Sequence, residues 1–167
     1  MRRDVRACLV MISPLVALLA AGQAGLRVNY TDSMPHGIYW RIPFSVPEKG
    51  DLVLYQPTPA PVFEEAWRRG LSPHHPLLKR LAAVEGDVVS IDDAGVVVNG
   101  RRLTNSAPLA YDPAGRPMPV CRLKDYRLSP GEVLLMSDYS PVSFDGRYFG
   151  TSQRAQIQSV VRAVWTW

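Results

Sequence analysis

The residues most able to carry chemistry lie around Ser33, within residues 29–40, NYTDSMPHGIYW. Pro35 fixes the direction of the chain just after the serine, and Gly37 permits a turn or a close backbone approach. A serine hydroxyl is a poor nucleophile until a neighbouring base takes its proton. The chemistry of this stretch therefore depends on which base the fold brings to Ser33.

Three histidines are candidates for that base: His36, His74 and His75. A serine–histidine site also needs a carboxylate that orients the imidazole, and the chain has no Gly-x-Ser-x-Gly elbow. His74 and His75 lie in a proline-rich loop, where a solvated histidine is typical. Histidine is therefore the weaker candidate for the base.

Lys79 is the stronger candidate. In a strand over residues 77–83 it shares one face with Leu77 and Leu81, whereas Arg80 points the other way. Lysine acts as a base only where an apolar, desolvated site lowers its pKa from ~10.4 towards neutrality. The same residues also fit a surface strand with a solvated lysine. The residues alone leave both interpretations open.

A third polar stretch runs from Ser143 to Gly150. Ser143 and Asp145 alternate, so they share a face of an extended chain. The Ser143 hydroxyl could hold the lysine amine, and Asp145 could pair with Arg147 or orient the serine. A turn closed by an Asp145–Arg147 salt bridge, without a catalytic role, fits these residues slightly better.

Short strands must position these residues. Fifteen prolines argue against a helical bundle, and Asn99-Gly100 is a strong hairpin signal. One helix is expected over 62–69 and an irregular segment over 104–130. A mostly β domain is predicted. The strands are expected at 39–44, 52–55, 77–83, 88–91, 96–98, 101–103, 132–136 and 159–165.

The N-terminal residues predict a membrane anchor. Residues 7–26 carry no charge and are long enough to cross a bilayer as a helix. Arg2, Arg3 and Arg6 precede them and favour a cytoplasmic N-terminus. We expect a transmembrane anchor at 1–27, with the lipid bilayer as a partner, and one domain at 28–167 outside the cytoplasm. A cleaved signal peptide with a small-residue site at 22–24 is the alternative.

Composition disfavours several other functions. The formal charge of +4 comes without a long basic run, and no nucleic-acid-binding motif is present, so we expect no nucleic-acid partner. The two cysteines, Cys8 and Cys121, cannot pair if the first lies in lipid. No Cys/His spacing predicts a zinc site. We expect neither a metal nor a cofactor.

Taken together, the motifs resemble the ordered sequence boxes of the type I signal peptidases. The short chain, the Ser-Met-Pro-x-Gly form and the proline-rich insert before Leu77 are most similar to the TraF-type conjugal-transfer peptidases of that family. Two positions differ: Ser137-Asp138-Tyr139-Ser140 stands where Gly-Asp-Asn-Arg is usual, and Asp145-Gly146-Arg147 where Asp-Ser-Arg is usual. The boxes are Ser33–Pro35, Gly50–Val53, Lys79–Val89 and Met136–Gly150.

The resemblance implies a signal-peptidase-like fold and a serine endopeptidase with a serine–lysine dyad. It also implies that the Ser33 backbone N–H helps to form the oxyanion hole. The residues that match the family's site are Ser33 as nucleophile, Lys79 as general base, Thr31 as the second oxyanion donor, Ser143 beside the lysine amine, and Asp145 with Arg147 as the supporting pair.

The resemblance further implies that the substrate is an exported precursor cut after a small residue, in the bacterial inner membrane with the catalytic domain facing the periplasm. It suggests a conjugative pilin precursor, matured beside the transfer apparatus by hydrolysis or by cyclising peptide transfer. Ile38, Leu77 and Leu81 are candidates for lining shallow substrate pockets. The alternatives are a housekeeping signal peptidase, a self-cleaving repressor with the same dyad, and a non-enzymatic scaffold of a secretion apparatus.

Overall fold

The computed structural model describes residue 22 and residues 25–167. Within them no helix is long and apolar enough to cross a membrane, and the expected anchor lies almost wholly outside them. The first strand begins at Leu26, two residues before the expected start of the domain. The elements in chain order are β1 (Leu26–Asn29), β2 (Gly37–Ile42), β3 (Leu52–Tyr55), α2 (Pro61–Arg68), β4 (Leu77–Ala83), β5 (Val88–Asp92), β6 (Gly95–Val98), β7 (Arg101–Arg102), β8 (Leu123–Arg127), β9 (Glu132–Met136), α3 (Gly146–Phe149), β10 (Ser152–Gln153), η1 (Arg154–Gln156) and β11 (Ile157–Thr166).

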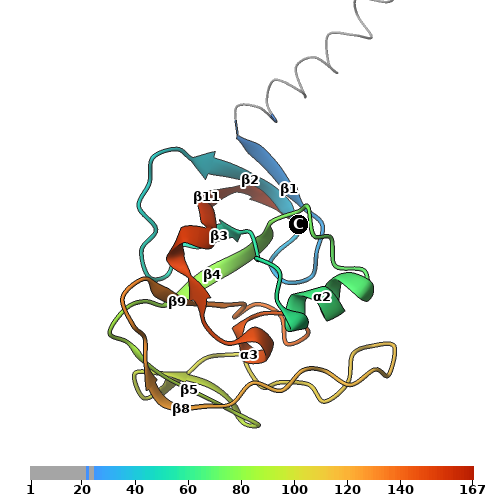
Figure 1. Ribbon diagram of the computed structural model, residues 1–167. Coiled ribbons are helices and arrows are strands. Elements are labelled where there is room, and N and C mark those ends of the chain that lie inside the picture. Colours follow the sequence, from blue (N-terminus) through green and yellow to red (C-terminus); the bar gives the residue numbers. More distant parts are fainter. Residues whose placement is uncertain (1–21, 23–24) are drawn as a thin grey trace, which may run out of the picture.

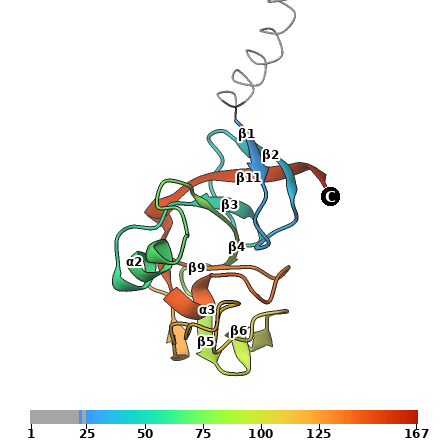
Figure 2. The ribbon, with the colours of Figure 1, turned by 90° about the vertical axis from the view of Figure 1, so that its right-hand side faces the viewer.

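The strands form two antiparallel sheets. The larger has the order β1-β2-β11-β3-β4-β9-β10, and the smaller has the order β7-β6-β5-β8. The smaller sheet lies at the end of the molecule away from β1 and β2 (Figure 1). After a quarter turn about the vertical axis the same separation is seen, with α3 between the two ends (Figure 2). The chain is therefore mostly β, as the sequence predicts.

Besides the end strand β10, two strand edges of the larger sheet have no neighbouring strand among the described residues. β1 is the outermost strand and pairs on one side only, with β2. β4 pairs with β3 over Leu77–Arg80, but its pairing with β9 begins only at Arg80. Residues 77–79 therefore have one edge without a neighbouring strand. An open edge presents backbone N–H and C=O groups that can pair with another chain.

An aromatic cluster packs the two helices over the larger sheet. Phe63 of α2 lies 4.9 Å from Phe149 of α3 and 6.0 Å from Phe144, measured between ring centroids. Tyr55 of β3 stacks on Phe149 at 6.1 Å. Such pairs add stability beyond their area of burial. This packing fixes the stretch that carries Ser143, Asp145 and Arg147.

The sequence predicts the bounds of β3, β4 and β9 without error. The Asn99-Gly100 hairpin is also confirmed, because both residues have the positive φ angles, 49° and 78°, of a tight two-residue turn. The prediction that residues 104–130 are irregular is wrong in part, because they contain β8. Prolines flank this strand and Asp125 within it has a φ of 45°, so the strand pattern is weak. The short helix α3 is also missed.

Candidate active site

Lys79 is buried in the larger sheet, with 1% of its surface exposed. Its Nζ donates a hydrogen bond to Ser143 Oγ at 2.8 Å. Desolvation lowers the pKa of the amine to about 8, opposed by the charge of Asp145 and assisted by that of Arg147. The surface-strand interpretation is therefore wrong, and a substantial fraction of this lysine is neutral near pH 8.

Ser33 and Lys79 line the same cavity, which has a volume of about 350 Å³. Its walls come from the chain just before Ser33 and from residues 70–79, so it lies beside the open edges of β1 and β4. Within the part of the chain that the structure describes, the Lys79 amine donates to Ser143 and not to Ser33. The Ser33 hydroxyl has no hydrogen-bond partner there, so it stays available to a ligand.

The loop around Ser33 is held by its carbonyl groups. The Nδ2 of buried Asn29, the last residue of β1, donates to the carbonyls of Thr31, Met34 and Pro35 at 3.0, 2.9 and 3.0 Å. The Tyr39 hydroxyl also donates to the Pro35 carbonyl, at 2.7 Å. These bonds define the loop conformation from both ends. Sequence reasoning missed Asn29, although a polar residue at the end of a strand just before the serine is the available signal.

Asn29 also orients Thr31. The Thr31 hydroxyl donates to Asn29 Oδ1 at 2.8 Å, and the Thr31 backbone N–H donates to the same oxygen at 3.3 Å. Thr31 lines the cavity together with Ser33. Its hydroxyl must rotate away from Asn29 to donate to a ligand. Among the described residues, the Ser33 backbone N–H has no acceptor, so this donor is free without rearrangement.

Ser137 connects the Ser33 loop to the buried charges. Its hydroxyl donates to the Ser33 carbonyl, and its backbone N–H donates to Asp145 Oδ2 at 2.9 Å. The same hydroxyl oxygen accepts from the Ser140 N–H at 3.1 Å. Ser137 stands where the resembling peptidases have glycine, which has no hydroxyl to make these bonds. The unusual residue therefore fixes the loop geometry in this chain, a role that sequence reasoning missed.

Asp145 and Arg147 form a fully buried ion pair with two contacts, Nε–Oδ1 at 2.7 Å and Nη2–Oδ2 at 2.9 Å. Arg147 also donates to the carbonyls of Ser137 at 3.2 Å and Pro141 at 2.9 Å. Removing one partner of such a pair leaves an uncompensated buried charge. The predicted salt bridge is confirmed. Asp145 does not bond to Ser33 and reaches its loop through Ser137.

Gly146 explains the second departure from the resembling motif. A Cβ atom at this position would lie 2.7 Å from Leu134 Cδ1 and 3.0 Å from the Leu135 carbonyl oxygen. Both contacts are with β9, on which α3 packs. A residue without a side chain therefore lets the start of α3 approach the sheet, and this approach places Asp145 and Arg147.

Of the three residues expected to line substrate pockets, only Leu77 lines the cavity. The expectation is wrong for Leu81, which is fully buried in the hydrophobic core. It is also wrong for Ile38, which does not line the cavity, whereas its neighbour Tyr39 does. Leu54 and Leu78 line the cavity in their place.

The three histidines are exposed or half-buried, whereas Lys79 is buried. His36 Nε2 is 3.0 Å from Asp32 Oδ1 in an exposed pair, and His36 does not line the cavity. His75 does line the cavity, with its Nδ1 2.7 Å from Ser72 Oγ. His74 is exposed and outside it. Within residues 25–167 no cluster of potential metal ligands is found.

A family model described as signal peptidase, peptidase S26, matches residues 6–167. The chain belongs to this signal peptidase family. A plasmid transfer protein TraF of Escherichia coli is 46% identical over 95% of this chain and 94% of its own length. A conjugal transfer protein TraF of Agrobacterium tumefaciens is 34% identical over 94% and 90%, respectively.

A solved signal peptidase I from Enterococcus faecalis V583 aligns with 70% of this signal peptidase family member and 97% of its own chain. The two are 21% identical with a TM-score of 0.39, a likeness too distant to carry an argument about the site. Membership in the peptidase family itself rests on the family model and on the TraF relatives.

Proposed function

We propose that Ser33 and Lys79 form the catalytic dyad of a serine endopeptidase that cuts an exported precursor. The observation that carries the proposal is a buried lysine, with a pKa of about 8, in the wall of a cavity that Ser33 also lines. A general base works best when its pKa lies near the working pH. The next residue of β4, Arg80, is half-exposed, and its guanidinium stays protonated, so it cannot serve as the general base.

The chemistry follows from the positions of the donors. Neutral Lys79 takes the Ser33 proton as Oγ attacks the scissile carbonyl carbon, and Ser143 holds the amine towards the cavity. The Ser33 N–H and the Thr31 hydroxyl donate to the oxygen that becomes negative. The Lys79 ammonium then gives its proton to the leaving amine, and an acyl-enzyme on Ser33 remains. In hydrolysis, water attacks the ester and releases the acid from Ser33. In peptide transfer, a second amine attacks the ester and forms a new peptide bond.

The open edges of β1 and β4 suit an extended peptide. Main-chain hydrogen bonds to these edges give affinity without sequence preference, and small pockets between them give specificity. The cavity that contains the dyad is also lined by Tyr39, Leu54, Leu77 and Leu78. We therefore propose that the residue before the cut is small, alanine above all, and that the third residue before the cut is small as well.

The names of the relatives suggest the setting. Proteins called plasmid transfer protein and conjugal transfer protein match nearly the whole chain. We propose that the substrate is a pilin precursor of a conjugative transfer apparatus, cut in the periplasm by a domain anchored to the inner membrane. A relative called probable signal peptidase I-2 of Synechocystis, 27% identical over 66% of this chain, keeps housekeeping cleavage of general precursors as the second candidate.

Co-expression of the chain with a pilin precursor, followed by mass spectrometry of the mature termini, tests the proposal. Ser33→Ala and Lys79→Ala should each abolish cleavage in a folded protein. Lys79→Arg should fail as well, because a guanidinium stays protonated. His36→Asn and His75→Asn are the matched controls and should cleave.

Loss of cleavage in a histidine variant, beside an active Lys79→Ala, would move the base to histidine. Cleavage of general secretory precursors without cleavage of any pilin would favour the housekeeping function. A mature pilin whose mass is one water lower than that of the linear product would show peptide transfer. Cleavage of neither precursor class would favour the scaffold function if the chain also fails to cleave itself, and a self-cleaving protein if it does.

A further inference from the structure

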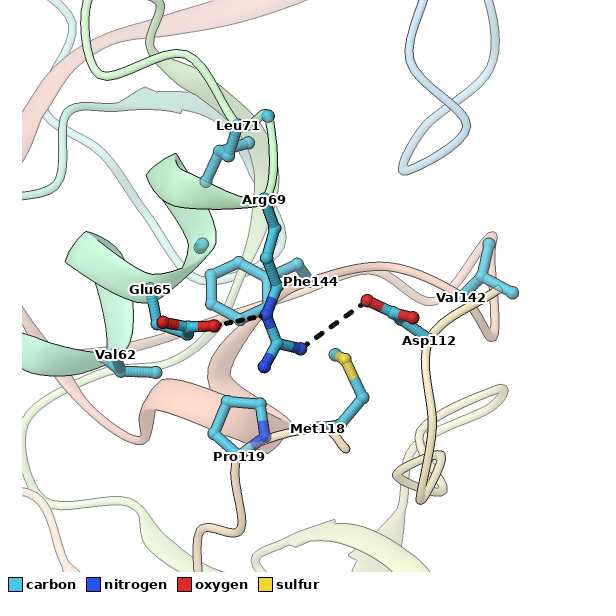
Figure 3. A pocket seen from close by; sticks show the side chains of 11 residues that line it. Val62, Glu65, Arg69, Leu71, Asp112, Met118, Pro119, Val142 and Phe144 are labelled. Atoms are coloured by element: carbon cyan, nitrogen blue, oxygen red, sulfur yellow. Dashed lines mark hydrogen bonds and ion pairs between the residues drawn. The ribbon is translucent and has the colours of Figure 1, made fainter. Parts of the chain in front are cut away.

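A second cavity, of about 330 Å³, adjoins the catalytic one. Gly70, Leu71 and Phe144 line both, so the two cavities are neighbours. Its walls come from α2, from the loop before β8 and from the stretch just before α3 (Figure 3). Two of these elements, α2 and the loop, lie in proline-rich insertions between strands of the sheets.

The walls are mainly apolar. Val62 and Ala66 face the cavity from α2, Met118 faces it from the loop, and Val142 and Phe144 complete it. Small-molecule and side-chain sites typically combine such walls with a few fixed polar groups. The cavity therefore suits an apolar side chain better than a charged one.

One fixed polar group is present. Arg69 lies between Glu65 and Asp112 in Figure 3, with Nε 2.7 Å from Glu65 Oε1 and Nη1 3.5 Å from Asp112 Oδ2. Its Nη1 also donates to the Pro117 carbonyl at 2.9 Å. Among the described residues Nη2 has no acceptor. A guanidinium held in this way can donate to a backbone carbonyl of a bound peptide.

The second cavity lies next to the expected place of the substrate. A peptide paired with residues 77–79 would occupy the catalytic cavity, which shares Leu71 and Phe144 with the second one, and each added residue extends such a peptide by ~3.3 Å. We propose that the second cavity is a subsite that binds an apolar side chain of the precursor several residues from the scissile bond. This inference rests on the proposed function, and it names a specificity determinant beyond the small residues at the cut.

The test uses synthetic peptides labelled with a fluorophore. All share an Ala-Gln-Ala cleavage sequence in a Gly/Ser background, and each carries one leucine at a different distance before or after the cut. Their dissociation constants are measured by anisotropy with the Ser33→Ala protein, so binding does not depend on catalysis. Cleavage of the parent peptide by the unmodified chain is measured separately.

We expect leucine at one distance to tighten binding about tenfold or more, the usual consequence of burying this side chain. Serine at the same distance should give no gain. Ala66→Phe fills the cavity and should remove the leucine gain, whereas Glu64→Phe, on the exposed side of the same helix, should keep it. A gain that survives Ala66→Phe, or no gain at any distance, overturns the subsite.

Failure of the subsite proposal can be distinguished from failure of the peptidase proposal. If the parent peptide is cleaved but leucine improves binding nowhere, the subsite is wrong and the peptidase proposal stands. If leucine improves binding through Ala66 but no peptide or precursor is cut, the subsite stands as a peptide-binding site and the proposed activity is wrong. Circular dichroism and urea unfolding of Ala66→Phe show whether the variant remains folded, and Met118→Phe tests the same cavity from another element.

Discussion

The side-chain hydroxyl of Ser137 donates a hydrogen bond to the backbone carbonyl of Ser33. The Ser137 backbone N–H is at the same time bound to Asp145, the buried partner of Arg147. A single residue thus connects the proposed nucleophile to the ion pair of the domain core. Asp145 therefore has two effects on the site: its charge raises the pKa of Lys79, and it positions Ser33 through Ser137.

Ser137→Gly, which introduces the residue usual in the resembling motif, should lower kcat by about tenfold with little change in KM. The hydroxyl is lost from a fully buried position, so stability should also fall by about 1–2 kcal/mol. Steady-state cleavage and urea unfolding measure the two effects. Ser45→Ala, an exposed change away from the cavity, is the control. An unchanged kcat in Ser137→Gly would show that the hydrogen bond does not position Ser33.

Asn29 should act on Thr31 as well as on the Ser33 loop. Thr31→Val removes the proposed oxyanion donor and should lower kcat by a factor of ~10²–10³, whereas Thr31→Ser keeps the donor.

Asn29→Asp places a carboxylate oxygen against three carbonyls in place of a donating amide, so it should reduce kcat and stability together.

The double variant Asn29→Ala/Thr31→Val separates these roles. Because Asn29 Oδ1 accepts from the Thr31 backbone N–H and so positions the Thr31 side chain, the loss in the double variant should be smaller than the product of the single losses. Fully multiplicative losses would mean that Asn29 holds only the loop.

The sequence predicts β3, β4 and β9 because each is a short apolar run bounded by turn residues. It also predicts that Lys79 and Ser143 meet, which the structure confirms with their hydrogen bond. Both expectations rest on local pattern and on the resemblance. The face shared by Leu77 and Leu81 was misleading, because Leu81 packs in the hydrophobic core with residues such as Phe63 and is fully buried there.

Other features depend on distant contacts that no local pattern encodes. Ser137 reaches the Ser33 carbonyl across 104 positions in the sequence. Asn29 gains its role only because the chain turns back above it, with Asn29 opposite Gly37 in the sheet. The second cavity combines α2, the loop before β8 and Phe144, and only the folded chain brings them together.

Gly146→Ser restores the residue usual in the resembling motif, yet it should destabilise this chain. The added Cβ would overlap Leu134 and crowd the Leu135 carbonyl, and overpacking of this kind costs about 1–3 kcal/mol. Urea unfolding measures the loss. Gly115→Ser is an instructive comparison, because nothing lies near its Cβ position and its cost comes only from a φ of 76°. Equal stability of Gly146→Ser and the unmodified chain would mean that β9 and α3 can move apart freely.

The pH dependence of cleavage should follow the Lys79 amine. The ammonium has no lone pair with which to accept the Ser33 proton, so kcat/KM should rise about tenfold per pH unit below the pKa of about 8 and level off above it. Initial rates from pH 5.5 to 9.5, with unfolding monitored in parallel, give the profile. An inflection near pH 6.5 that disappears in His75→Asn would instead identify a histidine base.

Lys79→Met should stabilise the chain, and the gain should depend on pH. The folded amine has a pKa of about 8 against 10.5 in the unfolded chain, so the unfolded state binds more protons between these values and stability rises with pH across that window. The unfavourable free energy of burying the charged amine is therefore present in full below pH 8 and disappears above pH 10.5.

Relative to the unmodified chain, the gain in Lys79→Met should fall by roughly 2–3 kcal/mol between pH 7 and pH 10. Urea unfolding of both proteins at the two pH values measures the difference. A gain that stays constant with pH would show that Lys79 keeps an ordinary pKa, and it would remove the main support for a lysine base.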